Sequence, residues 1–269
     1  MPASPAQPPR SKPVLLFFFA IVVFTLTFGI FALLRNPAKR SGTDPLFVYC
    51  AASLKAPMEQ ITADYARDKG VTVELTFGGS QTLLANISVS KRGDLYLPAD
   101  DSYLATARDK GLIGEALPIA GQTAVLAVPK GNPKQIRTLA ELGNSKLTLS
   151  QANPDTAAIG KLVRAQPGNL WMTLSNRTIV FKPNVVDAAN DVTLGAVDAA
   201  IVWDSMGQRY PDLDFIPLPE LAVVKANVAV SVLKCSEHPE AATQLAHYIA
   251  ARDKGLKRFA ENGFAVPFP

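Results

Sequence analysis

Histidine and cysteine are scarce in this chain of 269 residues, which contains two of each. Cys50 and Cys235 allow one disulfide at most and do not have the spacing of a zinc site. Each ends a strand-like run, and we predict two buried free thiols. His238 and His247 lie in a helical C-terminal stretch, but a spacing of nine residues does not put them on one helix face. We therefore expect surface histidines and no metal site built from protein ligands.

The chain also lacks the motifs of a nucleophilic enzyme. A catalytic serine needs a base and a third group that orients the base. No G-x-S-x-G turn occurs, and both histidines are confined to the C-terminal stretch. We therefore do not expect an enzyme or a cofactor, although a nucleophilic Ser53 or Ser80 is the alternative from another class of protein.

An excess of positive charge is missing from most of the chain, although the net charge is +4. Five of the 27 basic residues precede the first acidic residue, Asp44, which leaves 22 basic residues against 23 acidic ones. Binding to nucleic acid requires a clustered basic surface. The sequence therefore gives no reason to expect a nucleic-acid partner.

Residues 14–34 contain no charged side chain at all. A helix of about 20 apolar residues spans a bilayer, and this run is longer than the apolar part of an ordinary signal peptide. We find no small-x-small cleavage site after it and predict an uncleaved transmembrane anchor, with a cleaved signal peptide as the alternative. Residues 1–13 are then a disordered N-terminus, and residues 35–44 are a linker to a globular part outside the cytoplasm.

The remaining sequence alternates strand-like and helical segments, which predicts an α/β fold with a parallel sheet. Two long strand-like runs, near residues 122–130 and 225–235, interrupt the alternation. We predict that they form a double hinge between two lobes. Lobe 1 would contain residues 45–125 and 227–269, and lobe 2 residues 126–226.

Two serines stand where a strand meets a helix. Ser53 follows the run LFVYCAA, and Ser80 follows a strand and the pair Gly78-Gly79. A helix N-terminus presents unpaired N–H groups and positive dipole charge, so it binds anions without a basic side chain. Each serine taken alone is explained by a helix N-cap. Two such junctions beside one hinge cleft favour an anion site.

These segments also carry a family resemblance. The stretches AASLKAPMEQITADYARDKGVTVELTFGGSQTL and GDLYLPADDSYL resemble the first lobe of the periplasmic molybdate/tungstate-binding proteins, and the similarity continues through GAVDAAIVWDS to HPEAA. The resemblance implies a two-lobed class II periplasmic-binding-protein fold with a double-strand hinge. It further implies a monomer that captures molybdate or tungstate for the permease of an ABC importer, without a cofactor and with metal present only in the bound oxyanion.

The resemblance also assigns candidate ligand positions. They are Ser53 and Ser80 through their hydroxyls, Ile159 and either Val185 or Val186 through backbone N–H groups, and Trp203. The family has a tyrosine where this chain has Trp203, and an indole N–H cannot donate from the position of a phenol. The preferred ligand therefore stays open: another anion (sulfate, phosphate or a small organic acid) and a ligand-sensing ectodomain are the alternatives.

Overall fold

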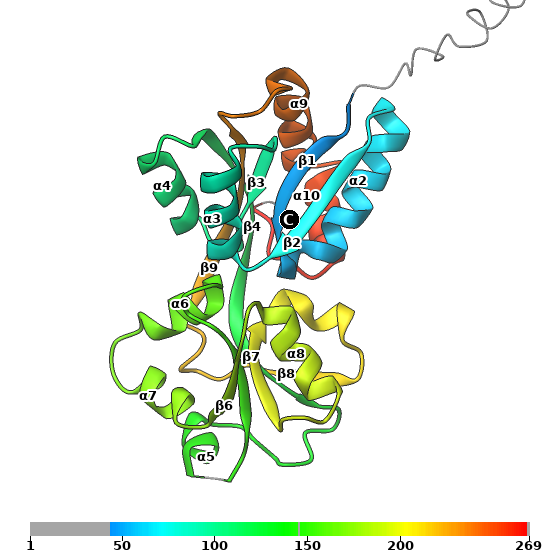
Figure 1. The fold of residues 1–269 in the computed structure, drawn as a ribbon. Helices are drawn as coiled ribbons and strands as arrows, with labels where there is room; N and C mark the ends of the chain where they lie inside the picture. The colour runs from blue at the N-terminus through cyan, green and yellow to red at the C-terminus, as the bar shows by residue number, and fades with distance from the viewer. Residues whose placement is uncertain (1–43, 145, 268–269) are drawn as a thin grey trace, which may run out of the picture. The chain divides into compact units, whose positions relative to one another are not determined.

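The computed structural model describes residues 44–144 and 146–267, and these described residues form one compact unit (Figure 1). The predicted N-terminus 1–13, the predicted anchor 14–34 and nearly all of the predicted linker 35–44 lie outside the described residues. Within the described part of the chain, no helix has the length and apolar character needed to cross a membrane.

The first sheet starts with three parallel strands, each followed by helix. In chain order these elements are β1 (Leu46–Ala51), the 3-10 helix η1 (Ala52–Leu54), α2 (Lys55–Lys69), β2 (Val73–Gly78), α3 (Ser80–Ser90), β3 (Leu95–Leu97) and α4 (Ser102–Asp109). Helix α2 buries Met58, Ile61 and Tyr65, which share one helix face. It ends at Gly70, whose φ of 69° is the left-handed conformation that favours glycine.

Strand β4 (Ile113–Pro129) belongs to both sheets. Its first part pairs antiparallel with β9 (Lys225–Leu233), and residues 124–129 pair antiparallel with strands of the second sheet. The sequence predicts a strand only from residue 122, because Gly114 and Pro118 interrupt the earlier pattern. The pairing register between β4 and β9 shifts between Ile113 and Ala116 and again between Pro118 and Ala120. These irregularities let the strand accommodate Gly114 and Pro118.

The second sheet contains the parallel strands β5, β6 and β7, with β8 at the side of β4. Its elements are α5 (Leu139–Asn144), β5 (Leu149–Ala152), α6 (Ala158–Arg164), α7 (Leu170–Ser175), β6 (Thr178–Lys182), α8 (Val185–Thr193), β7 (Ala199–Trp203), the 3-10 helix η2 (Asp204–Arg209) and β8 (Leu213–Ile216). The strand order is β2-β1-β3-β9-β4-β7-β5-β6. The prediction of a parallel sheet is therefore wrong around β4 and β9, because the chain passes between the sheets there and runs antiparallel to its neighbours.

Both cysteines are free thiols, as the sequence predicts, but only Cys50 is fully buried. Burial raises the pKa of the Cys50 thiol far above its ordinary value.

His247 is exposed and His238 is half-buried at the start of α9 (Pro239–Ala250). The described residues contain no group of three metal-ligating side chains that a metal ion would need.

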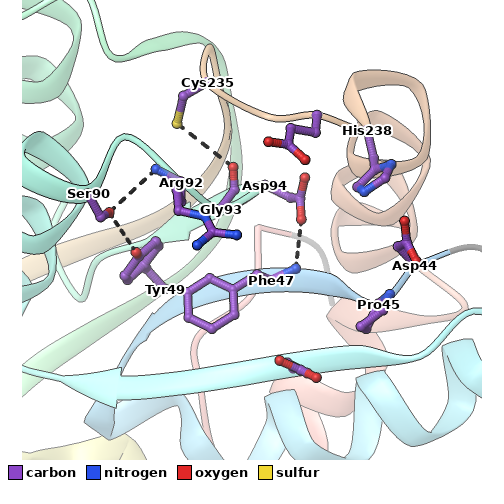
Figure 2. Close-up of a pocket in the computed structure, with 12 residues that line it drawn as sticks. Asp44, Pro45, Phe47, Tyr49, Ser90, Arg92, Gly93, Asp94, Cys235 and His238 are labelled. Atoms are coloured by element: carbon purple, nitrogen blue, oxygen red, sulfur yellow. Dashed lines mark hydrogen bonds between the residues drawn. The ribbon is translucent and has the colours of Figure 1, made fainter.

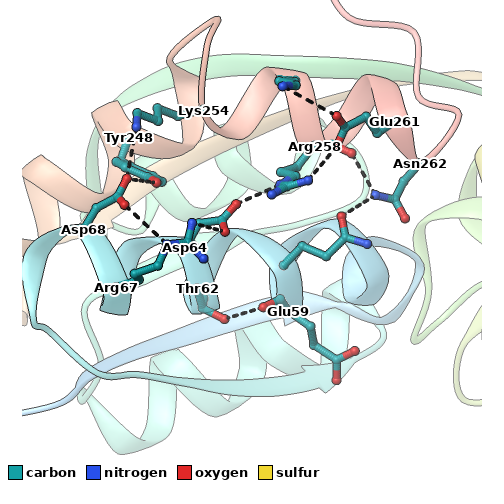
Figure 3. Close-up of polar contacts among 12 residues, drawn as sticks. Glu59, Thr62, Asp64, Arg67, Asp68, Tyr248, Lys254, Arg258, Glu261 and Asn262 are labelled. Carbon is teal, nitrogen blue, oxygen red and sulfur yellow. Dashed lines mark hydrogen bonds and ion pairs between the residues drawn. The ribbon is translucent and has the colours of Figure 1, made fainter.

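The C-terminal helices α9 and α10 (Gly255–Glu261) are tied to α2 by charged side chains (Figure 3). The Asp64 carboxylate accepts a hydrogen bond of 2.7 Å from Arg258 Nε. Asp68 accepts bonds of 2.8 Å from the Tyr248 hydroxyl and 3.0 Å from Lys254 Nζ. The two ends of the folded unit are thereby joined on one side of the first sheet.

We expect this attachment to weaken in acid. The hydrogen bond from Arg258 is the main cause that lowers the pKa of Asp64, and the Tyr248 hydroxyl is the main cause for Asp68. A carboxyl whose folded pKa is lowered stabilises the fold above its unfolded pKa of about 4, and that stabilisation is lost as the pH falls through the folded value. Urea unfolding should therefore become easier as the pH falls below about 4.

The variant Asp64→Asn measures the share of this effect that one carboxyl provides. Its unfolding midpoint should fall less steeply with pH than that of the unmodified protein, because it has lost one of the titrating groups. Asp109→Asn is the control, since Asp109 is exposed at the end of α4, outside this cluster. Equal pH dependence in Asp64→Asn and the unmodified protein would contradict the assignment.

Candidate oxyanion-binding site

A small cavity lies between the loops of the two sheets. The residues that line it are Ala51, Ala52, Ser53, Gly78, Gly79, Ser80, Ala99, Ala157, Ala158, Ile159, Asn184, Val185 and Trp203. They come from the carboxyl ends of strands and the starts of the following helices, where ligands bind in α/β sheets. The lining that the structure describes contains no Asp, Glu, Lys, Arg or His. Its polar groups are therefore neutral hydroxyl, indole, amide and backbone groups.

Ser53 is buried in η1, directly after β1. Its hydroxyl oxygen has no hydrogen-bond partner among the residues that the structure describes. Neither η1 nor α2 has a side-chain N-cap, so the structure does not support the N-cap explanation of Ser53. A buried hydroxyl without a partner costs about 1–3 kcal/mol. A ligand in the cavity would supply that partner.

Ser80 is the first residue of α3 and is also buried. Its Oγ accepts a bond of 3.1 Å from the Ala99 N–H, and its carbonyl accepts one of 2.7 Å from the Tyr96 hydroxyl. A hydroxyl that accepts one bond still has its own proton to donate. The Ala99 contact therefore fixes the Ser80 oxygen at the cavity wall and leaves it a donor.

The backbone donors come from the second sheet. Asn184 is the N-cap of α8, and its Oδ1 accepts bonds of 3.0 and 3.1 Å from the N–H groups of Val186 and Asp187. The N–H of Val186 is therefore already used within the helix cap. In addition, the described cavity lining includes Val185 but not Val186. Of the two candidate valines, the structure therefore places only Val185 at the cavity, and the N–H of Val186 already has Asn184 as its acceptor. Ile159 lies in the first turn of α6, where N–H groups have no acceptor within the helix.

Trp203 closes the cavity from the end of β7. Its side chain is fully buried, and its indole Nε1 has no hydrogen-bond partner in the described part of the chain. Two residues of the cavity lining, Ser53 and Trp203, thus each have a buried polar atom without a partner among the described residues. The neighbouring Asp204 is exposed, and its carboxylate accepts hydrogen bonds from the N–H groups of Thr123 and Ser205. It therefore holds backbone groups where β4 crosses between the sheets and is not part of the described cavity lining.

Sequence reasoning missed Gln122, which lies at the crossing point of β4. Its Nε2 donates to the Ala99 carbonyl at 3.0 Å, and its Oε1 accepts a bond of 3.0 Å from the Ser205 hydroxyl. Through Ala99 it supports Ser80, and through Ser205 it reaches the segment after Trp203. The only signal in the sequence is a glutamine at the start of an apolar strand.

Gly79, directly before Ser80, lies at a close contact between loops of the two sheets. A Cβ on Gly79 would lie 2.4 Å from the Thr156 carbonyl oxygen and 2.6 Å from that of Pro183. Both carbonyls belong to loops of the second sheet. Next to this contact, the Gln81 N–H donates to the Thr156 carbonyl at 3.0 Å. Gly79 is therefore the point where the two sheets' loops meet.

A second, larger cavity of about 470 Å³ lies at the amino end of β1 (Figure 2). Its lining includes the acidic residues Asp44, Glu74, Asp94 and Glu237. The buried Asp94 is already satisfied by the Phe47 N–H at 2.7 Å and the Ser236 hydroxyl at 2.6 Å. These four carboxyl groups outnumber the one guanidinium in the lining, that of Arg92, and would repel an oxyanion. Of these two cavities, the small one with neutral donors is therefore the better candidate for an anion site.

Comparison with known proteins identifies the family of the chain. Residues 46–265 match the family of bacterial extracellular solute-binding proteins. The chain belongs to this family and is a solute-binding protein that acts outside the cytoplasm.

Individual relatives confirm the resemblance to periplasmic molybdate-binding proteins. The chain is 28% identical over 229 residues to the molybdate-binding protein of Mycobacterium tuberculosis, covering 84% of this chain and 86% of that protein. The periplasmic molybdate-binding protein of Azotobacter vinelandii has a TM-score of 0.70 at 20% identity over 83% of this chain and 100% of its own. The sulfate-binding protein of Mycobacterium tuberculosis has a TM-score of 0.76 at 17% identity over 84% and 88%. At these identities the two structures show the fold alone.

Proposed function

We propose that the protein captures a tetrahedral oxyanion, molybdate or tungstate, between two lobes and delivers it to an ABC permease. The observation that carries the proposal is a pair of buried polar atoms, Ser53 Oγ and Trp203 Nε1, which lack partners among the described residues and belong to two residues that line one cavity. The relatives that bind molybdate support the choice of anion. Sulfate is the second candidate, because a sulfate-binding protein has a similar fold.

The donor set suits an anion that carries no proton. Hydroxyl and N–H groups from Ser53, Ser80, Ile159, Val185 and Trp203 would surround the four oxygens, and hydrogen bonds to a charged acceptor are stronger than neutral ones. Phosphate retains a proton at neutral pH and needs an acceptor such as a carboxylate. The described lining offers no carboxylate, so we expect phosphate to be rejected.

Strands β4 and β9 would be the double hinge of the two lobes, lobe 1 with residues 45–125 and 227–269 and lobe 2 with residues 126–226. A monomer that closes its lobes on the anion would present it to the permease. The anchor over residues 14–34 belongs to this proposal as a membrane tether of the folded part.

Titration calorimetry with molybdate, tungstate, sulfate and phosphate tests the function. We expect one molybdate or tungstate per chain, weaker binding of sulfate, and no heat from phosphate. Binding of phosphate in preference to the other three anions would contradict a site of neutral donors. A chain that binds none of the four would refute the proposal.

Trp203 should report on ligand binding. Molybdate would accept a hydrogen bond from its indole N–H, which changes the surroundings of the ring. Intrinsic fluorescence should shift on adding molybdate, and Trp203→Phe should remove most of the shift and weaken binding by about 1.5–3 kcal/mol, as for a lost bond to a charged acceptor.

Trp171→Phe is the matched control for this prediction. Trp171 packs against Phe181, with ring centroids 5.9 Å apart, and is not part of the described cavity lining. The fluorescence shift should survive in this variant. A shift that survives Trp203→Phe but disappears in Trp171→Phe would contradict the assignment of Trp203 to the cavity wall.

A further inference from the structure

A lysine connects the two lobes outside the anion cavity. Lys161 lies in α6 of the second lobe, and its Nζ donates a hydrogen bond of 2.8 Å to Ser102 Oγ at the start of α4 in the first lobe. The ammonium also lies 4.3 Å from the centroid of the Tyr103 ring, within the range of a cation–π interaction. Lys161 follows the cavity residue Ile159 by two positions, so this contact forms beside the cavity.

The acceptor of the lysine is held in place by its own neighbours. The Ser102 hydroxyl donates to the Asp100 carboxylate, and the Ser102 N–H donates to the same oxygen at 3.1 Å. Asp100 is only 4% exposed. Burial is the main cause that raises the pKa of Asp100, and the nearby Lys161 ammonium opposes that rise. Ser102 therefore presents a fixed oxygen to Lys161, polarised by its bond to the carboxylate.

One backbone amide reports whether the lobes are in contact. Gln81 is the second residue of α3, where the helix itself provides no acceptor for its N–H. Its acceptor is the Thr156 carbonyl of the second lobe, at 3.0 Å. Exchange of the Gln81 amide hydrogen with solvent therefore requires that this contact between the lobes opens.

We propose that Lys161 is a positioning residue that holds the lobes closed through Ser102 and Tyr103. The bond spans the lobes, so closure forms it and opening breaks it. A stronger closed state raises the affinity for any ligand that binds between the lobes. The effect on the anion rests on the proposed function, whereas the effect on closure does not.

The test compares Lys161→Met with the unmodified full-length chain in the absence of ligand. Methionine keeps an unbranched apolar stem and removes the ammonium. Exchange at the Gln81 amide, followed by mass spectrometry, should become about tenfold faster, the effect expected of a lost charged hydrogen bond. Lys161→Arg should recover part of the protection, because a guanidinium also donates hydrogen bonds and stacks on a ring.

Two further variants make the result specific. Lys130→Met removes an ion pair of 2.9 Å with Asp214 that lies within the second lobe, so exchange at Gln81 should stay at the unmodified rate. Ser102→Ala removes the acceptor from the opposite lobe and should accelerate exchange as Lys161→Met does. If Gln81 exchanges at the same rate in Lys161→Met as in the unmodified chain, the proposal is overturned, and acceleration in Lys130→Met as well would overturn it too.

Calorimetry with molybdate on the same variants separates this proposal from the proposed function. Lys161→Met should bind molybdate about tenfold more weakly, in step with the loss of closure. An unmodified chain that binds none of the four oxyanions would refute the proposed function, while the exchange rates would still decide the role of Lys161. Faster exchange with unchanged molybdate affinity would overturn the link between Lys161 and ligand retention.

Discussion

Gly79→Ala should weaken molybdate binding by about 100-fold, because overpacking costs roughly 1–3 kcal/mol. The added Cβ would lie 2.4 and 2.6 Å from the carbonyl oxygens of Thr156 and Pro183. These are backbone atoms of the other lobe, and they cannot turn away as a flexible side chain would. The φ and ψ of Gly79, −70° and 143°, suit alanine, so the open protein should fold normally. The variant should therefore lose closure without losing its fold.

Calorimetry gives the affinity in this experiment, and thermal unfolding without ligand gives the stability. Gly114→Ala is the matched control, because a Cβ there meets no atom within 4 Å and no left-handed φ is involved. It should bind molybdate normally. Normal binding by Gly79→Ala would mean that the contact of Gly79 with Thr156 and Pro183 is not part of the bound state.

Ser53→Ala should weaken molybdate binding by about 1.5–3 kcal/mol, the value of a hydrogen bond to a charged acceptor. The ligand-free protein should keep its stability or gain slightly. The reason is that the Ser53 hydroxyl is buried without a partner among the described residues, so its removal leaves no protein group unsatisfied.

Ser80→Ala is the informative comparison, because the two serines differ in their partners. It should weaken binding by a similar amount. It should also destabilise the ligand-free protein by about 1 kcal/mol, since the Ala99 N–H loses its acceptor. Thermal unfolding and calorimetry on both variants measure the two effects. A Ser53→Ala variant that binds molybdate normally would remove Ser53 from the site.

Much of the fold is predictable because its signals are local in the sequence. The apolar run of β1, the helical spacing of Met58, Ile61 and Tyr65, and Gly70 as the helix end all act within a few residues. Ser53 and Ser80 are local signals of the same kind, since each marks a strand-to-helix junction. The Asn184 cap could also have been found, because a capping asparagine followed three residues later by Asp187 is a known helix-start pattern.

The remaining features depend on contacts between distant segments. Gln122 and Ser205 are 83 residues apart, and Lys161 and Ser102 are 59 apart. Neither pair has a pattern that predicts its partner before the topology is known. Helices α5 and α7 have six residues each and β8 has four, which is too short for periodicity to identify them.

In the proposed closure of the two lobes, the shared strand β4 would define the axis of the movement. Gln122 donates a hydrogen bond to the Ala99 carbonyl on one side and accepts one from the Ser205 hydroxyl on the other. These bonds would resist sliding of one lobe past the other, so rotation would be the easier motion. In a rotation, displacement grows with distance from the axis. Trp203, two residues from Ser205, would then move little, whereas the contacts of Gly79 and Lys161 between the lobes would open. In the proposed function, the anion would leave through the rim, while the wall near the axis would stay assembled.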